Sequence, residues 1–332
     1  MPILRMRRRK FIFATAGVAA WPVVARAQRV PPVIGIVSIT TREAALQTPW
    51  YRAFNEGLRE HGWEPGKNLF IEHRFAENDP RKLVPLVREL VRLDLRAIFV
   101  PTRPALRVVK EATTTIPIVF VSLGDPVAEG WVTNLARPNG NLTGVAGLSP
   151  ELAGKRLQLL RELVPSLKKI AVLWNPSNSP EEVAVKAIEI SARNLGMSSP
   201  VVQRVLSREK LRDAITSIVQ AGGKSIVVLP DPMFFENRVE IVGLINQAGI
   251  PAIYMETGFV AAGGLISYGP KFTELFRLAA TYVDKILKGA KPGELPIEQP
   301  TNFELVINLK TATALGVAVP TSILFRADQI IE

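Results

Sequence analysis

The chain has 332 residues, a formal net charge of +11, two histidines and no cysteine. The absence of cysteine excludes disulfide bonds, thiol catalysis and cysteine-type zinc sites. A chain of this length usually forms two domains.

The N-terminus predicts an export signal. Residues 1–10 carry five positive charges and no acid, residues 11–25 form an apolar run, and Ala-Arg-Ala at 25–27 precedes Gln28. A basic region, a short apolar region and a small-x-small cleavage site are typical of a secretory signal peptide, which we place at residues 1–27. The apolar run is shorter than the roughly 20 residues that a membrane-spanning helix needs.

The export signal affects the charge and the expected location. Arg8 and Arg9, followed by Lys10 and Phe11, resemble a twin-arginine signal, and the general secretory route is the alternative. The signal holds six of the net positive charges, which leaves +5 on the mature chain, so we expect no nucleic-acid partner. No cysteine follows the cleavage site, so we expect a protein without a lipid anchor, free in the periplasm.

After the signal, short β-branched apolar runs alternate with helical patterns. The first series predicts strands at 32–38, 68–75, 97–100 and 117–122 and helices at 50–61, 80–92 and 104–112. The second predicts strands at 169–174, 200–205, 225–229 and 251–254 and helices at 180–195, 208–221 and 236–248. This rhythm favours an α/β fold with two doubly wound parallel-sheet lobes joined by a hinge.

The last part of the chain shows where it passes between the lobes. It predicts strands at 265–268 and 303–308, helices at 272–287 and 310–315, and a loop at 288–300. Residues 144–163 and 265–283 each contain a strand, a Pro that suits a first helical turn, and a helix. We therefore assign residues 30–147 plus about 262–290 to the first lobe, and residues 148–261 plus about 291–332 to the second.

Candidate binding residues of the first lobe directly follow its strands, because ligands of open α/β sheets lie at the carboxyl ends of the strands. Thr102 and Arg103 open a helix, whose N-terminus and guanidinium suit a carboxylate; a solvated Arg in a loop is the alternative. Ser122 is a second pocket candidate. Asp125 suits a helix cap better than a ligand contact.

The second lobe offers candidates in the same positions. Asn175 and Ser177 are small polar residues at a strand end. Asp231 lies between two prolines and is expected to pair with a ligand ammonium, or else to cap a helix. Tyr254 and Tyr268 end two strands and would provide aromatic walls with a hydroxyl group.

Motifs for catalysis, metals and cofactors are missing. The chain contains no G-x-S-x-G elbow, no phosphate loop and no G-x-G-x-x-G fingerprint after its first strand. His61 and His73 lack the spacing of metal ligands. We therefore expect no enzymatic activity, no metal and no cofactor.

Several segments together resemble a known family. They are the leader end at 20–28 (AWPVVARAQ), 116–120 (IPIVF), 124–127 (GDPV), 135–144 (LARPNGNLTG), 262–270 (AGGLISYGP) and 303–312 (FELVINLKTA). Over nearly the whole mature chain, they resemble the ABC transporter substrate-binding family that includes receptors for tryptophan and other aromatic amino acids. One departure is Thr102-Arg103-Pro104-Ala105, where family members commonly have a glycine-containing turn; a more acidic or bulkier ligand would follow.

The resemblance implies a type I periplasmic-binding-protein fold. It also implies an extracytoplasmic receptor that holds a small molecule, an amino acid or related carboxylate, between its lobes. Its partner would be an ABC permease of the inner membrane with its ATPase, and we expect the receptor to be a monomer. A periplasmic sensor that feeds a signalling partner is the alternative, followed by a secreted α/β hydrolase.

Overall fold

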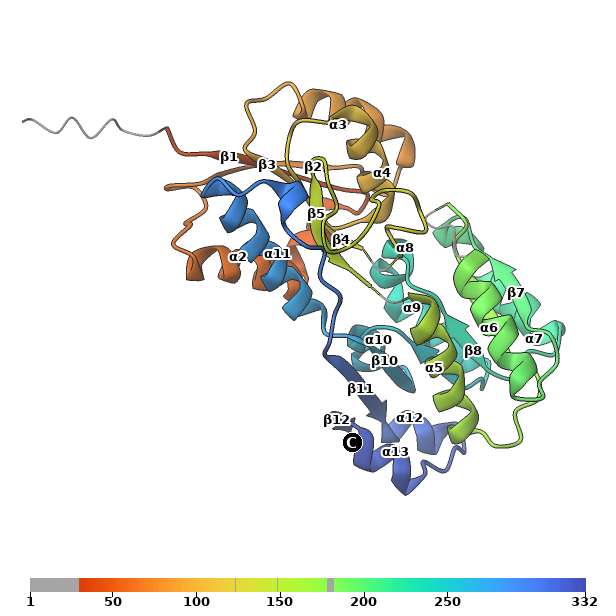
Figure 1. The fold of residues 1–332 in the computed structure, drawn as a ribbon. Helices are drawn as coiled ribbons and strands as arrows, with labels where there is room; N and C mark the ends of the chain where they lie inside the picture. Colours follow the sequence, from red (N-terminus) through yellow and green to blue (C-terminus); the bar gives the residue numbers. More distant parts are fainter. Residues whose placement is uncertain (1–29, 123, 148, 178–181) are drawn as a thin grey trace, which may run out of the picture. The chain divides into compact units, whose positions relative to one another are not determined.

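The computed structural model describes residues 30–332 except 123, 148 and 178–181 (Figure 1). Residues Pro31–Glu332 form one compact unit. The expected signal peptide at residues 1–27 lies outside the described part and stays a prediction.

The first sheet has five parallel strands in the order β2-β1-β3-β4-β5. Its strands are β1 (Val33–Ser38), β2 (Phe70–Phe75), β3 (Ala97–Val100), β4 (Ile118–Ser122) and β5 (Leu142–Ala146). Its helical segments are α1 (Arg42–Gln47), α2 (Pro49–Glu60), η1 (Pro80–Lys82), α3 (Leu83–Leu90), α4 (Arg103–Ala112) and α11 (Phe272–Leu287). The chain places β2 on one side of β1 and β3 on the other, which creates a topological switch point.

The second sheet has seven strands in the order β12-β11-β10-β9-β8-β6-β7, and only the β10–β11 pair is antiparallel among the described strands. Its strands are β6 (Ala171–Trp174), β7 (Val201–Arg204), β8 (Ile226–Val228), β9 (Ala252–Tyr254), β10 (Ile266–Pro270), β11 (Phe303–Asn308) and β12 (Gln329–Ile331). Its helical segments are α5 (Ser149–Leu163), α6 (Glu182–Asn194), η2 (Arg208–Lys210), α7 (Leu211–Gln220), α8 (Pro232–Glu236), α9 (Arg238–Gln247), α10 (Thr257–Ala261), α12 (Leu309–Ala314) and α13 (Thr321–Arg326). A further 3-10 turn, η3 (Pro292–Glu294), contacts β5 of the first sheet.

Both faces of each sheet are buried, as a parallel sheet requires. In β3, Phe99 packs under α2 and α11, whereas Ile98 and Val100 pack under α3 and α4. Phe99 stacks on Phe54 of α2 with ring centroids 4.3 Å apart. In the second sheet, one core lies against α5 and α6 and another against α7 and α9. The expected α/β fold with two doubly wound lobes is confirmed.

The sheet topology places the lobe boundaries differently from expectation. We call the five-stranded sheet with its helices the first lobe and the seven-stranded sheet with its helices the second lobe. The strand β10 pairs with β9 and β11, so residues 266–270 belong to the second lobe, whereas α11 packs on α2 of the first. The backbone N–H of Ile297 donates a hydrogen bond of 2.7 Å to the carbonyl oxygen of Leu135, and Glu298 forms a β-bridge with Val145. The first lobe therefore includes the chain to about residue 298.

Two further differences concern elements. The expected helix at 236–248 is α9, and a separate short helix that the sequence patterns did not predict, α8, precedes it and ends at Glu236. The sequence patterns also missed four other short elements, which are α1, α10, α13 and β12. Among the described residues, no helix is both long and apolar enough to cross a bilayer.

Candidate functional site

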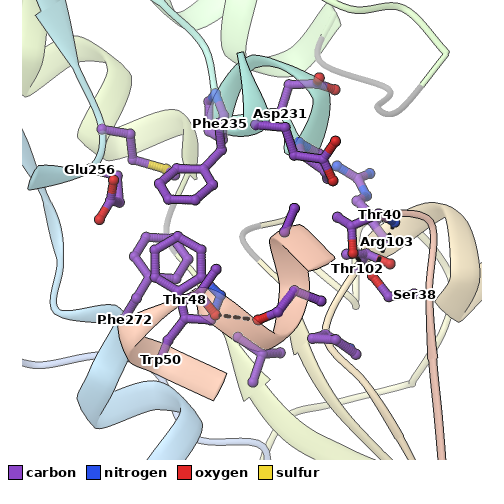
Figure 2. A pocket seen from close by; sticks show the side chains of 18 of the residues that line it. Ser38, Thr40, Thr48, Trp50, Thr102, Arg103, Asp231, Phe235, Glu256 and Phe272 are labelled. Carbon is purple, nitrogen blue, oxygen red and sulfur yellow. Dashed lines mark hydrogen bonds between the residues drawn. The ribbon is translucent and has the colours of Figure 1, made fainter. Parts of the chain in front are cut away.

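A cavity of about 160 Å3 is lined by residues of both lobes (Figure 2). Its walls come from the segments that follow β1, β3 and β4 in the first lobe and β8 and β9 in the second, together with the first turns of α2 and α11. This volume is about ten times the roughly 10–15 Å3 that one water molecule occupies on the same measure. The cavity therefore has room for a small organic molecule at the carboxyl ends of the strands, where the sequence predicted a cleft.

Hydroxyl groups line the first-lobe part of the cavity. The Ser38 and Thr40 hydroxyls lie 2.8 Å apart, and Thr102 Oγ1 accepts a hydrogen bond of 3.2 Å from the backbone N–H of Ile39. Ser122 Oγ accepts one of 3.3 Å from the backbone of Gly124. Thr102 thereby ties the loop after β3 to the loop after β1, and the loops after three neighbouring strands present small donors and acceptors to one space.

Arg103 begins α4 and forms a two-pronged ion pair with Glu129. Its Nη2 lies 2.7 Å from Glu129 Oε1, and its Nε donates to Oε2 at 3.1 Å. Burial raises the pKa of the Glu129 carboxyl, against the opposing effect of the Arg103 charge. A Cβ on Gly124 would lie 2.1 Å from Glu129 Oε1, so a side chain there would have to displace this carboxylate. The charge of Arg103 at the cavity is therefore largely balanced within the first lobe.

Asp231 faces the cavity from the second lobe (Figure 2). Its side chain is 8% exposed, and Oδ1 accepts a hydrogen bond of 3.1 Å from the backbone N–H of Phe234. The residue thus caps α8, and Pro232 fits the first helical position because it needs no N–H donor there. A carboxylate has about four acceptor positions, so capping is compatible with a ligand contact.

Aromatic side chains form the other part of the cavity wall. Trp50 of α2 contacts Phe235 of α8 with ring centroids 4.3 Å apart, and Phe272 of α11 with centroids 5.3 Å apart. Phe259 and Phe276 also line the cavity. The Trp50–Phe235 contact joins the two lobes across the site. Sequence reasoning missed these residues, because aromatic residues at helical spacing usually belong to a core.

Glu256 is a further cavity residue that the sequence did not single out. It follows β9, and its Oε2 accepts a hydrogen bond of 2.7 Å from the backbone N–H of Gly258. Burial raises the pKa of this carboxyl to about 7, against smaller opposing effects of its hydrogen bonds and of Arg238. Its position directly after a strand of the second lobe is the signal that could have found it.

Three of the expected site residues lie away from this cavity in hydrogen-bonded turns. Asp125 accepts hydrogen bonds from the backbone of Val127 and Ala128 at 2.9 and 3.1 Å, and it holds a turn, because the next element along the chain is the strand β5 and not the helix that it was expected to cap. Asn175 Oδ1 accepts from the backbone N–H of Ser177 at 3.0 Å. None of these three residues lines the cavity, and their contact with a ligand stays a prediction.

The two tyrosines also lie outside the cavity lining. Tyr254 is fully buried and stacks on Phe259 with centroids 4.8 Å apart, so it supports a wall residue from behind. Tyr268 stacks on Phe303 with centroids 6.0 Å apart. The sheet brings Thr102, Arg103, Ser122 and Asp231 to one space and leaves both tyrosines beside it.

The two histidines make hydrogen bonds to side chains of the first lobe. His61 Nε2 lies 3.0 Å from Thr281 Oγ1, and His73 Nε2 contacts the Tyr51 hydroxyl. Burial lowers the pKa of His73 to about 4. Within the described residues, no group of three potential metal-binding side chains comes together.

Comparison with known proteins gives one consistent result. The family model described as ABC transporter substrate binding protein matches residues 33–331. A tyrosine-binding protein of Clostridioides difficile (strain R20291) is 28% identical over 267 residues, which cover 80% of this chain and 75% of the relative.

Two solved structures agree over most of the fold. A conserved domain protein from Vibrio cholerae is 28% identical with a TM-score of 0.83, and the match covers 91% of this chain and 100% of the other. An ABC domain from Streptococcus pneumonia in complex with L-Trp is 25% identical, with the same TM-score and the same coverage.

Proposed function

This chain belongs to the family of ABC transporter substrate-binding proteins, and from that premise we propose that it captures an aromatic amino acid in its inter-lobe cavity. The family binds and does not convert its substrates, so the chain is a solute-binding protein and not an enzyme. A permease of the inner membrane, with its ATPase, would receive the solute.

The observation that carries the ligand class is the division of the cavity into a polar and an aromatic part (Figure 2). Ser38, Thr40, Thr102 and Ser122 offer hydroxyl groups for a carboxylate, and Asp231 offers a carboxylate for an ammonium. Trp50, Phe235 and Phe272 offer faces on which a ring can stack. A zwitterion with an aromatic side chain satisfies both parts, and the tyrosine- and tryptophan-binding relatives agree with this class.

Residues from both lobes contribute to each part of the cavity. Thr102 and Trp50 belong to the first lobe, and Asp231 and Phe235 belong to the second. A ligand that contacts both lobes binds their closed arrangement more tightly than a separated one. That difference is what drives closure, since a ligand shifts an equilibrium only by its differential affinity.

We further propose that the mature protein works in the periplasm. The basic leader and the cleavage site before Gln28 support export. The absence of cysteine after the cleavage site supports a form without a lipid anchor.

Thermal unfolding of the mature chain, from residue 28 onward, tests the ligand class. We expect L-tryptophan or L-tyrosine to raise the Tm through linkage, because only the folded state binds. Tryptamine and indole-3-propionate keep the ring but lack one charge each, and should raise it far less. A chain that no aromatic amino acid stabilises, but that another solute class does, would contradict the proposal.

A further inference from the structure

We propose that Glu256 selects the ligand by accepting a hydrogen bond from a donor on its ring, so that phenol or indole rings are preferred to a plain phenyl ring. The inference rests on the proposed function, because it assigns one part of the same cavity to the ring of an aromatic amino acid.

Glu256 lies at the aromatic part of the cavity. Figure 2 shows its carboxylate on the side of Phe235 and Phe272, away from the group formed by Ser38 and Thr102. A ligand whose charged head is held by the hydroxyl groups and Asp231 would direct its ring toward Phe235 and Phe272, and the far edge of that ring toward Glu256.

The backbone holds this carboxylate in place. Its Oε2 accepts from Gly258 N at 2.7 Å, and Oε1 accepts from the Thr257 hydroxyl at 3.3 Å. A Cβ on Gly269 of β10 would lie 1.9 Å from the carbonyl oxygen of Met255, so glycine there permits close contact between the two strand ends. A carboxylate has about four acceptor positions, and two are therefore still available to a ligand.

The electrostatic surroundings of the Glu256 carboxylate favour a hydrogen bond from the ligand. No Lys or Arg nitrogen of the described residues lies within 4.0 Å of the Glu256 carboxylate. Arg238 is the cation that acts on it, but its guanidinium lies over the Phe235 ring and donates to the Phe235 carbonyl oxygen. Glu304 of β11 adds a second negative charge. A buried acceptor with so little compensation gains from any donor that the ligand brings.

The contrast with Glu129, another buried acid, supports the assignment. Glu129 faces the guanidinium of Arg103 directly, and its charge is satisfied within the first lobe. Glu256 has a backbone donor and a hydroxyl, and the space beside it is the cavity. A site built to accept a hydrogen bond discriminates strongly against an analogue that lacks the donor, because the acceptor is then left unpaired.

Two ligand pairs, each differing only in the ring donor, test the proposal by calorimetric titration. They are L-tyrosine with L-phenylalanine, and L-tryptophan with 1-methyl-L-tryptophan. For whichever parent binds, we expect loss of the donor to raise Kd roughly 10- to 100-fold in the wild-type protein. In Glu256→Leu the two Kd values of each pair should differ by less than about threefold. Glu256→Gln keeps an acceptor oxygen and should retain part of the preference for the ligand with the ring donor.

The control separates specificity from folding. Asn308→Ala removes a comparable side-chain cap, the one that accepts from Thr311 N at 3.0 Å in the second lobe, and it does not line the cavity. It should leave the ratio of the two Kd values unchanged. A wild-type ratio below about threefold, or a ratio that survives in Glu256→Leu, would overturn the proposal while leaving the proposed function intact. Failure of every aromatic amino acid to bind would contradict the proposed function itself.

Discussion

Glu236 of the second lobe accepts a hydrogen bond of 3.0 Å at Oε1 from the backbone N–H of Thr41 in the first lobe. Its other oxygen accepts from the side-chain amide of Asn78, also in the first lobe. Glu236 lines the cavity next to Phe235, which contacts Trp50 across the same boundary. The end of α8 therefore joins the two lobes through one carboxylate and one aromatic ring.

This relationship predicts that Glu236 supports ligand affinity through lobe closure. Glu236→Ala removes two hydrogen bonds that exist only when the lobes are together, each worth about 1 kcal/mol. We expect Kd to rise roughly 5- to 30-fold, and the radius of gyration of the ligand-free protein in small-angle scattering to increase.

A matched control for this variant is Glu240→Ala on α9, whose ion pair with Arg208 at 2.8 Å stays within the second lobe. It should change neither the affinity nor the radius. An unchanged radius and Kd in Glu236→Ala would show that these inter-lobe bonds do not contribute to closure.

Asp231 is expected to pair with the ligand ammonium while it caps α8. Asp231→Asn keeps a capping oxygen for Phe234 N but removes the charge, so circular dichroism should match the wild-type protein. We expect Asp231→Ala to weaken a zwitterionic ligand on the order of a hundredfold, since a buried ammonium is left without its partner. Asp231→Asn should weaken it by a similar factor if the partner is an ammonium, and by less if the partner is a neutral donor.

The measurement is titration calorimetry on variants that circular dichroism shows to be folded. Wild-type affinity in a folded Asp231→Ala protein would remove this residue from the site. Loss of folding in Asp231→Ala with normal binding by Asp231→Asn would leave capping as its only role.

Glu256 gives the stability of the ligand-free protein a distinct pH dependence. The pKa of its carboxyl is about 7 in the folded protein against an ordinary 4.5, so the folded state binds the proton more tightly than the unfolded state. Its contribution to stability is therefore present in full below about pH 4.5 and is lost as the pH rises to about 7. Arg238 and Glu304 also act on this carboxyl and stay the same when Glu256 is replaced.

Glu256→Gln should abolish this dependence. We expect the variant and the wild-type protein to have similar free energies of unfolding at pH 5, and the variant to be more stable by roughly 1–3 kcal/mol at pH 8. Urea denaturation at pH 5 to 8 measures the free energy of unfolding of both proteins. Other titrating groups such as His73 contribute equally to both, so their effect cancels in the difference. Parallel curves for the two proteins would contradict the assigned protonation.

Export can be tested on the precursor. If Arg8 and Arg9 form a twin-arginine signal, changing both to Lys should leave precursor inside the cell. Unchanged export of that variant would indicate the general secretory route. N-terminal sequencing of the exported wild-type protein should begin at Gln28, and an intact leader would contradict the periplasmic location.

Most of the fold could be predicted because its signals are local. The apolar runs at 97–100 and 117–122 match β3 and β4 within a residue, since strands buried on both faces need continuous apolar sequence. The first helical turn at Arg103 was also readable, because Pro104 suits such a position. The lobe of β10 was not readable, because pairing with β11 connects segments more than 30 residues apart.

The sequence by itself determined the α/β class, the two doubly wound lobes and the position of polar candidates such as Thr102, Ser122 and Asp231 after strands. These depend on periodicity and on turn chemistry, which act over a few residues. Only the tertiary structure decided that Trp50 and Phe272 form the cavity wall while Tyr254 packs behind it. Whether an aromatic side chain faces a core or a cavity depends on the segment packed opposite, and that segment comes from a distant part of the chain.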